Sequence, residues 1–295
     1  MLTIGAFDGV HRGHQEVLAS MRSNGEPGLP LTVVTFDRHP LSVVRPEVAP
    51  RLLTDIATKL DLLSSLGVDT TCVVPFDEQR ATEEPEAFIE DVLVNALGAR
   101  YVVVGADFRF GRNRRGDVAL LAELGKQFGF EVFGLDLAGA GDQPISSTRI
   151  RQLVASGEVK LAAELLGRSF SLRGVVEHGD GRGGPELGFP TANLGIADGL
   201  AQPGVGIYAG YVTLASQEVV QAAISVGRRP TFYEYADPLI ECYLLDFNRD
   251  LYGEHLEVTF VEKLRDEQRF ETVDALIEQM HRDVAATRTI LAAAE

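Results

Sequence analysis

Short runs of apolar residues alternate with amphipathic stretches over the first half of the chain. Five runs have the composition of buried parallel strands: LTIGAF (2–7), LTVVTFD (31–37), TTCVVPF (70–76), YVVVGAD (101–107) and EVFGLDL (131–137). Between them, residues 83–97 place Phe88, Ile89, Val92, Leu93, Ala96 and Leu97 on one stripe of a helix. This alternation predicts an α/β fold, a doubly wound, Rossmann-like parallel sheet.

The rhythm changes after residue 167. The strands become shorter, alternate in polarity and are separated by Gly and Pro: residues 171–179, 206–215, 219–227, 239–247 and 256–264. This pattern predicts a small antiparallel β-barrel. A closing helix over residues 272–293 places Val273, Leu276, Ile277, Met280, Val284, Ile290 and Leu291 near one face, which we expect to pack on the barrel. We therefore predict two domains, 1–167 and 168–295.

Polar residues follow the predicted parallel strands where those strands end. The turn GAFDGVHRGH follows the first strand, Asp37 and His39 follow the second, and Asp107 follows the fourth. Ligands of such sheets bind outside the carboxyl ends of the strands. We expect a ligand site at this edge.

His11 and His14 stand three residues apart around Gly13, where a strand leads into a helix. Free backbone N–H groups at a helix start favour an anion, Gly13 allows a phosphate to approach closely, and both imidazoles can donate hydrogen bonds to it. Phosphate binding is the favoured interpretation. A zinc site and a purely structural role stay open at this point, although no third metal ligand stands nearby in the sequence.

The segment ISSTRIRQL carries a second anion-binding pattern. Ser147 or Thr148 can cap a helix whose first turns hold Arg149 and Arg151. An ordinary capped helix with solvated arginines explains the pattern equally well. Together with the histidine turn, however, this helix start could bind a triphosphate.

Composition narrows the function classes. The formal net charge of −16 disfavours nucleic acid as a partner, although small anions bound with Mg²⁺ fit an acidic chain. No apolar run is long enough to span a membrane, and Asp8 and His11 interrupt any signal peptide, so we expect a cytoplasmic protein. Cys72 and Cys242 stand far apart in apolar runs, and we interpret them as core thiols.

The second half offers a hydroxyl, an amide and a carboxylate. Thr191 and Asn193, in LGFPTANLG, suit Mg²⁺ and phosphate oxygens, although a barrel loop is the simpler interpretation. Glu241 alternates with apolar and aromatic residues in LIECYLLDF, so a partly desolvated general base and a surface carboxylate are both open. The string GDGRGG (179–184) is not a dinucleotide fingerprint, because Pro185 and Pro190 forbid the helix that must follow.

Four motifs of the first half resemble, in order, the nucleotidyltransferase half of the prokaryotic bifunctional riboflavin kinase/FMN adenylyltransferase (FAD synthetase) family. They are GAFDGVHRGH, VTFDRHP, VGADFRFG and ISSTRIR. The resemblance implies that the phosphate of FMN attacks the α-phosphorus of ATP, with His11, His14 and Arg151 as catalytic contacts. It also implies that ATP is bound by Gly5, Phe7, Gly13, Asp107, Ser147 and Thr148, and that Asp37 lies at the flavin.

The second half resembles the riboflavin kinase module of the same family, through GFPTAN, GIYAG, VGRRPTF, IECYLLDF and LYGEHLEVTFVEKLRDEQRF. By this resemblance, Thr191 and Asn193 bind Mg-ATP and the metal, and Glu241 deprotonates the 5′-hydroxyl of riboflavin. Arg182, Arg265 and Phe270 are implied at the flavin. Riboflavin, FMN, FAD and ATP are then the substrates and products, with neither nucleic acid nor membrane as a partner.

Several positions depart from the family pattern. Ala6 replaces a usual Asn, Arg38 a common Pro, and Gly184-Pro185-Glu186 a second basic stretch. A lost cation beside polyphosphate costs about 1–3 kcal/mol. Two alternatives follow: an adenylyltransferase with weak kinase activity, and a catalytically silent flavin-binding regulator. The latter predicts a DNA-binding segment, but the sequence contains no basic recognition helix.

Overall fold

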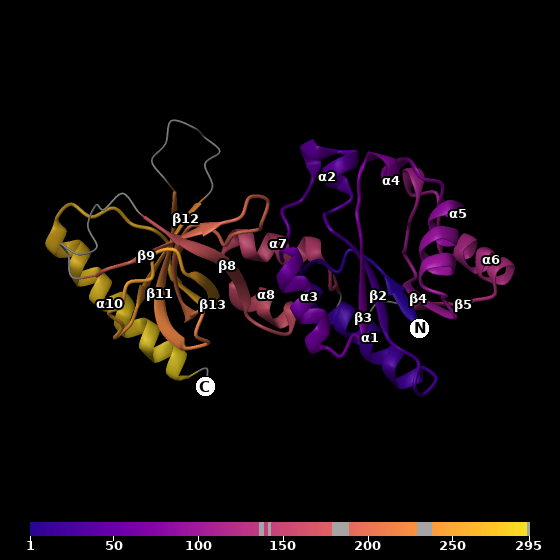
Figure 1. The fold of residues 1–295 in the computed structure, drawn as a ribbon. Coiled ribbons are helices and arrows are strands. Elements are labelled where there is room, and N and C mark those ends of the chain that lie inside the picture. Colours follow the sequence, from indigo (N-terminus) through magenta and orange to yellow (C-terminus); the bar gives the residue numbers. More distant parts are fainter. Residues whose placement is uncertain (136–138, 141–142, 179–188, 229–237, 294–295) are drawn as a thin grey trace. The chain divides into compact units, whose positions relative to one another are not determined.

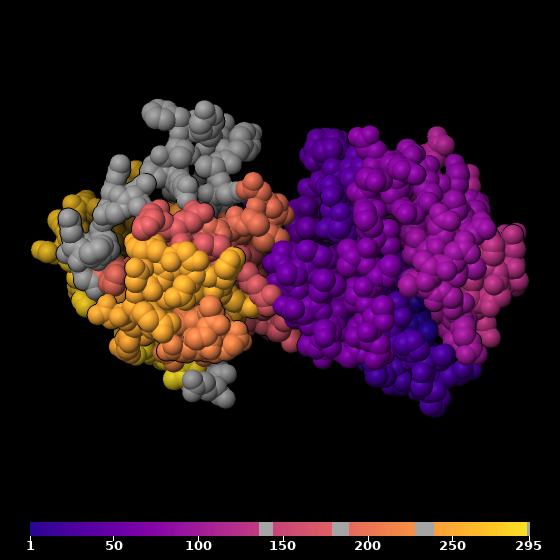
Figure 2. Space-filling model, in the orientation of Figure 1, coloured from indigo at the N-terminus to yellow at the C-terminus, as the bar shows by residue number. Residues whose placement is uncertain are grey.

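A computed structural model describes the chain except for residues 136–138, 141–142, 179–188, 229–237 and 294–295. The chain divides into two compact units, Met1–Ser147 and Thr148–Glu295, called here the α/β unit and the barrel unit. Figure 1 shows the elements of each unit and Figure 2 their surfaces, coloured along the sequence. Each unit is described by itself.

The α/β unit contains a five-stranded parallel sheet. Its strands are β1 (Leu2–Ile4), β2 (Thr32–Phe36), β3 (Thr70–Val74), β4 (Tyr101–Gly105) and β5 (Glu131–Leu135), in the order β3-β2-β1-β4-β5. All five predicted strands and the parallel fold are confirmed. After β3 the chain crosses from one side of β1 to the other, so the β1–β4 neighbourhood is the switch point where ligands of such sheets bind.

Two hydrophobic cores cover the two faces of this sheet. Val34, Val102 and Val104 face a core with α5 and α6, whereas Val33 and Val103 face a core with α1 and α3. Because successive side chains of a strand point to opposite faces, burial on both sides requires continuous apolar runs. The other described elements are η1 (Asp8–Val10), α1 (Arg12–Asn24), α2 (Leu41–Val44), η2 (Pro46–Val48), α3 (Ile56–Ser65), α4 (Glu78–Thr82), α5 (Pro85–Phe88), η3 (Ile89–Ala96), η4 (Arg112–Arg114), α6 (Val118–Phe128) and the small hairpin β6 (Gly139–Ala140) and β7 (Gln143–Pro144).

The helix predicted over residues 83–97 is more irregular than expected. It starts as α5 and continues as η3, which is a π-helix. Phe88, Ile89, Val92 and Leu93 are buried, but Ala96 is exposed, contrary to the predicted stripe. The i to i+5 hydrogen bonds of a π-helix widen its turns, so a stripe drawn for an α-helix no longer fits at its end.

The barrel unit contains a closed six-stranded barrel. The order is β10 (Gly206–Thr213), β11 (Val219–Arg228), β12 (Pro238–Leu244), β9 (Ala192–Ile196), β8 (Phe170–Glu177) and β13 (His255–Arg265), all neighbours antiparallel. The predicted barrel is confirmed, but β9 is a strand that the prediction treated as a loop. The helices α7 (Ser147–Ser156) and α8 (Val159–Leu166) precede the barrel.

The closing helix α10 (Val273–Ala292) lies along β10, β11 and β13, as predicted (Figure 1). Its buried residues, however, are Asp283, Thr287 and Leu291, whereas Val273 is 58% exposed. The rest of the predicted stripe lies on the buried side of the helix, since Leu291 is buried and Leu276, Ile277, Met280, Val284 and Ile290 are half-buried, so only Val273 departs from the prediction. Asp283 is buried because it binds Arg265 of β13.

The domain boundary after residue 167 stays a prediction. The compact units divide between Ser147 and Thr148, so α8 belongs to the barrel unit. Within that unit the N–H of Gly204 donates to the carbonyl of Val154 at 3.0 Å, and Lys160 on α8 binds Glu262 at 2.8 Å. These contacts attach residues 148–167, which the sequence placed at the end of the first domain, to the barrel.

Candidate active sites

The histidine turn, residues 5–14, leaves the carboxyl end of β1. Three residues of this turn have positive φ angles, +49° at Phe7, +78° at Gly9 and +41° at Val10. Phe7 and Val10 carry side chains that disfavour this region, so surrounding contacts must hold the turn in place. His11 then precedes α1 with extended angles, as the sequence predicted for a strand-to-helix turn.

Contacts from several segments fix this turn. The buried carboxylate of Asp8 accepts hydrogen bonds from the backbone N–H groups of Leu53 and Thr54, at 2.9 and 3.3 Å from Oδ1. The Thr54 hydroxyl accepts from the N–H of Gly9 at 3.2 Å. The Ser147 hydroxyl donates to the carbonyl of Asp8 at 3.0 Å. Ser147 thus supports the turn, whereas the sequence placed it at a helix cap or at ATP.

His11 and His14 come together at the start of α1. Their rings stack with centroids 3.7 Å apart, and the ring of Phe7 lies 4.7 Å from that of His14. Burial, the neighbouring His11 and the charge of Lys59 hold the pKa of His14 well below its ordinary value. Nδ1 of His14 is shielded from solvent and has no hydrogen-bond partner among the described residues. Two stacked imidazoles at a helix start are suited to donating ring N–H hydrogen bonds to an anion.

Gly13 and Gly5 leave the space that the rings of His11 and Phe7 occupy. A Cβ on Gly13 would lie 3.3 Å from two atoms of the His11 ring, and a Cβ on Gly5 would lie 3.2 Å from the ring of Phe7. Gly13 therefore makes room for His11 itself, in addition to the space that the sequence predicted for a phosphate. Among the described residues, no three His, Cys, Asp or Glu side chains gather in a way that could hold a metal ion.

Asp37 and Asp107 lie at the same edge of the sheet, after β2 and β4. Asp37 Oδ1 accepts from the N–H of Phe76 at 2.9 Å, and Oδ2 pairs with Arg38 at 3.0 Å. Burial raises the pKa of Asp37, but the hydrogen bonds from Phe76 and Arg38 outweigh it and the net shift is downward. Asp107 is exposed in the turn after β4. Asp37 is therefore an ionised carboxylate whose two oxygens already bind Phe76, after β3, and its neighbour Arg38.

The arginines before residue 167 differ in the unit to which they belong and in their ion pairs. Arg149 and Arg151 lie on α7, in the barrel unit, with exposed Thr148 before them. Arg112 and Arg115, which stand close together in the sequence after β4, both bind Glu84, at 3.3 and 3.1 Å. These ion pairs reduce the positive charge available there to an anion.

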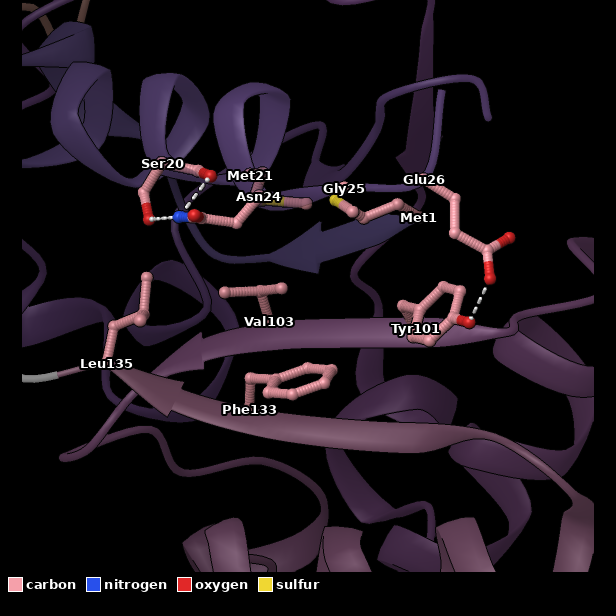
Figure 3. Close-up of a pocket in the computed structure, with 10 residues that line it drawn as sticks. All are labelled: Met1, Ser20, Met21, Asn24, Gly25, Glu26, Tyr101, Val103, Phe133 and Leu135. Carbon is pink, nitrogen blue, oxygen red and sulfur yellow. Dashed lines mark hydrogen bonds between the residues drawn. The ribbon is translucent and has the colours of Figure 1, made fainter. Parts of the chain in front are cut away.

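A pocket of about 370 Å³ lies elsewhere in the α/β unit, between α1 and the strands β4 and β5 (Figure 3). Val103, Phe133 and Leu135 form its apolar floor. Its polar groups bind one another: Tyr101 donates to Glu26 at 2.7 Å, and Asn24 donates to Ser20. None of the predicted site residues lines this pocket. Its lining is Met1, Ser20, Met21, Asn24, Gly25, Glu26, Tyr101, Val103, Phe133 and Leu135.

Strand register brings the candidate residues of the barrel together. Glu241 on β12 lies directly opposite Asn193 on β9 and opposite Ser225 on β11. Directly opposite residues of antiparallel strands share one face of the sheet. All three are half-buried, while the alternate residues Ile240, Cys242 and Leu244 are buried in the barrel. Glu241 and Asn193 therefore point to the outer side of the barrel wall, next to each other.

Aromatic residues border this polar group. Phe189, only 5% exposed, makes edge contacts with Tyr243 at 5.0 Å and with His281 of α10 at 5.1 Å. Thr191 is half-buried just before β9. The apolar and aromatic wall predicted beside Glu241 is right at Leu239 and Tyr243. Leu245 and Phe247, in contrast, follow the end of β12, where alternation no longer applies.

Arg265 and Phe270, predicted at the flavin, have protein partners in the structure. Arg265 binds Asp283 of α10 and donates to the carbonyl of Asp266 at 3.0 Å, and its guanidinium lies 5.9 Å from the centre of the Phe270 ring. Arg265 thus joins β13 to α10. Arg182 and the segment Gly184-Pro185-Glu186 lie outside the described residues.

Sequence reasoning missed two buried charged residues. Lys59, on α3, is 6% exposed and lies at the carboxyl ends of β1 and β2, and Asp283 lies in the middle of α10. Neither belongs to a motif. A lysine or an aspartate among the buried positions of an amphipathic helix is the only signal that could have identified them.

Both halves of the chain are similar to known proteins. Residues 1–149 match the family model of FAD synthetase, and residues 166–291 match that of riboflavin kinase. A bifunctional riboflavin kinase/FMN adenylyltransferase of Escherichia coli K12 is 39% identical over 98% of this chain and 91% of its own length. The chain belongs to this family. The enzyme of the same name from Listeria monocytogenes is 37% identical, over 100% of this chain and 93% of its own.

A solved structure has a similar fold over nearly the whole chain. It is a Streptococcus pneumoniae protein described as a macrolide-efflux protein, with a TM-score of 0.85, 32% identity, and coverage of 97% of this chain and 93% of its own. No helix in the described part of the present chain has the length and apolar character that crossing a membrane requires.

Proposed function

We propose that the chain catalyses both reactions named for its family. In the barrel unit, ATP phosphorylates riboflavin, giving FMN and ADP. In the α/β unit, ATP transfers its AMP moiety to FMN, giving FAD and pyrophosphate. Both family models match, and the bifunctional relatives align along nearly the whole chain. The observation that supports the proposal is that the candidate residues of each reaction come together within one unit, since His11 stacks on His14 and Glu241 lies directly opposite Asn193.

Adenylyl transfer needs alignment and charge neutralisation more than a base. The attacking FMN phosphate is ionised at neutral pH; its oxygen forms a bond to the α-phosphorus while the bond to pyrophosphate breaks. His11 and His14 would donate hydrogen bonds to phosphate oxygens, and the backbone at the start of α1 would add its N–H groups. Arg151, with Ser147 and Thr148, is assigned to the departing pyrophosphate on the sequence motif ISSTRIR alone. Further contacts to ATP are assigned to Gly5, Phe7, Gly13 and Asp107.

Phosphorylation of riboflavin does need a base, because the nucleophile is a neutral alcohol. Glu241 would accept the proton of the ribityl 5′-hydroxyl as the oxygen attacks the γ-phosphorus and ADP leaves. Asn193, directly across the strand pair, would orient a phosphate oxygen next to that carboxylate. Their common position on the outer barrel wall supports this assignment.

Mg²⁺ is expected to accompany ATP at the kinase site. The hydroxyl of Thr191 and the amide oxygen of Asn193 are hard oxygen donors, which suit this ion. When bound, the ion would neutralise charge on the phosphates. The side chains present fit that role, because both donors lie on the same short segment that leads into β9 beside Glu241.

The flavin contacts are assigned by a weaker argument. Asp37 lies at the edge of the sheet near Phe76, and Phe270 follows β13. Arg182 is assigned on the sequence motif alone. Because Arg265 binds Asp283, its proposed part is to hold Phe270 and the start of the following segment at the flavin.

A time course with riboflavin, ATP and Mg²⁺ tests the proposal, with the flavins separated by chromatography. We expect FMN to appear first and FAD to follow as FMN accumulates. FAD formation from added FMN without FMN formation from riboflavin would instead favour an adenylyltransferase with a weak kinase. Tight flavin binding with neither product would favour a silent flavin-binding protein.

A further inference from the structure

A buried lysine lies beneath the histidine turn, outside every motif that identifies the family. Lys59 is only 6% exposed. Its ammonium donates to the carbonyl of Ala6 at 3.1 Å, to the carbonyl of Phe36 at 3.1 Å and to the hydroxyl of Thr35 at 3.3 Å. An ammonium has three donors, and each of them has an acceptor here.

The three acceptors lie where β1 and β2 end. Ala6 is the residue before Phe7, which adopts left-handed angles and packs against His14. The hydroxyl of Thr35 also donates to the carbonyl of Ala6, at 3.0 Å. Lys59 therefore joins the beginning of the histidine turn to the neighbouring strand.

The helix that carries Lys59 is itself fixed against the turn. Leu53 and Thr54, just before α3, donate to Asp8, and Asp55 caps α3 by accepting from the N–H of Thr58 at 2.7 Å. One turn later the helix presents Lys59 to the ends of the strands. The same segment thus contacts the turn at Ala6, Asp8 and Gly9.

The charge of Lys59 also reaches His14. The described groups that act on the pKa of His14 are His11, which stacks on it, and Lys59, and both lower it. Burial lowers the pKa of Lys59 too, against the opposing effect of Asp8 and Asp37, and no carboxylate is hydrogen-bonded to it among the described contacts. The ammonium of Lys59 is therefore bound by two carbonyl groups and a hydroxyl and not by a carboxylate. Its positive charge can act on His14 without being cancelled by a direct ion pair.

We propose that Lys59 is a positioning residue for adenylyl transfer: its ammonium fixes the start of the histidine turn to the ends of β1 and β2 and places a positive charge near His14. The proposal rests on the assignment of adenylyl transfer to the α/β unit. Lys59 itself is buried behind the turn and acts through His14, Phe7 and the backbone.

The variant Lys59→Met tests this role, because methionine has a similar length and no charge. We expect FAD synthesis from FMN and ATP to lose about tenfold or more in kcat, since a small misplacement of catalytic groups has effects of this size. Riboflavin phosphorylation by the same preparation should stay within about twofold of the wild type. Lys126→Met, which removes an exposed lysine of α6, is the control for net charge and should leave both activities unchanged.

A purely structural role would not change the ionisation of one particular histidine. We therefore expect NMR titration of the substrate-free protein to show a higher pKa for His14 in Lys59→Met than in the wild type. The chain has six histidines, and the spectrum of His14→Gln identifies the signal. FAD synthesis within about twofold of the wild type, or an unchanged pKa of His14 in a folded variant, would overturn the proposal.

If Lys59→Met does not fold, Thr35→Val decides the question. Valine has the shape of threonine but removes one of the three acceptors and the bond to Ala6, while the charge remains. We expect at least a threefold loss of kcat/KM for ATP in FAD synthesis; no loss would overturn the proposal. If the wild-type chain makes no FAD, the proposed function fails, whereas the His14 titration still tests the effect of Lys59.

Discussion

The guanidinium of Arg265 binds the carboxylate of Asp283 through two nitrogen atoms, Nε at 2.9 Å and Nη2 at 2.7 Å. Both side chains are largely buried, with exposures of 17% and 9%. The pair connects the last barrel strand to the closing helix, and Gln279 adds a hydrogen bond to Asp283 at 2.8 Å. The position of α10 on the barrel therefore depends on an ion pair as well as on apolar packing.

Replacing Asp283 by Asn should destabilise the barrel unit by about 2–4 kcal/mol, because it leaves a largely buried guanidinium without its counter-charge. Urea unfolding followed by far-UV circular dichroism measures this change. The control is Glu278→Gln, which removes an exposed ion pair with Arg282 and should cost less than about 0.5 kcal/mol. Equal losses of unfolding free energy in the two variants would show that the buried ion pair stabilises the protein no more than the exposed one does.

Gly13→Ala should impair FAD synthesis without weakening the helix. The added methyl group would lie 3.3 Å from the His11 ring and displace it, whereas alanine is a better helix former than glycine. We expect about a tenfold lower rate of FAD formation from FMN and an unchanged rate of riboflavin phosphorylation. Gly134→Ala on β5 is the matched control, since its methyl group meets only Val118, at 3.4 Å. A fully active Gly13→Ala would show that the position of His11 is not critical.

The buried Tyr208 should make the folded protein less stable at alkaline pH. Its ring is fully buried, and burial, followed by the charges of Asp266 and Glu158, raises its pKa to about 12. The unfolded chain releases this proton near pH 10, so stability is fully present below that pH and falls as the pH rises from about 10 to about 12. By about pH 10.5 the loss from this residue should be about 0.8 kcal/mol.

The variant Tyr208→Phe separates this effect from other alkaline changes. It should be about 1 kcal/mol less stable at pH 8, because the hydroxyl donates to the partly buried carbonyl of Gly204, but its stability should fall less between about pH 9 and 10.5. Tyr252→Phe, at a ring that is 53% exposed, is the control. Parallel pH curves for the wild type and Tyr208→Phe would contradict the prediction.

The hydrophobic periodicity of the sequence predicted the sheet and most of the barrel. Strands buried on both faces are continuously apolar, and strands buried on one face alternate between apolar and polar residues. The periodicity did not identify β9, because Ala192–Ile196 is short and follows Phe189-Pro190-Thr191, which has the composition of a loop. Strand register could not be predicted either. The pairing of Glu241 with Asn193 depends on how β9 enters the barrel, and only the structure gives it.

The candidate sites were predictable where a local motif carries the chemistry. His11 and His14 are three residues apart across the start of α1, so their spacing in the sequence already indicated that their side chains could lie close together. Lys59 and Asp283 were not predictable, because each acts through partners distant in the sequence. In the hydrophobic pattern, each of them is only a charged residue at a position where an apolar one is expected. Which residues they bind can be seen only in the folded structure.

The central claim is that the two phosphate transfers use separate groups in separate units. The most direct measurement compares Glu241→Gln and His14→Ala in assays of FMN formation from riboflavin and of FAD formation from FMN, with folding checked by circular dichroism. We expect Glu241→Gln to lose FMN formation by about a hundredfold or more while making FAD from added FMN at the wild-type rate, and His14→Ala to show the reverse. Loss of both activities in either folded variant would contradict the account.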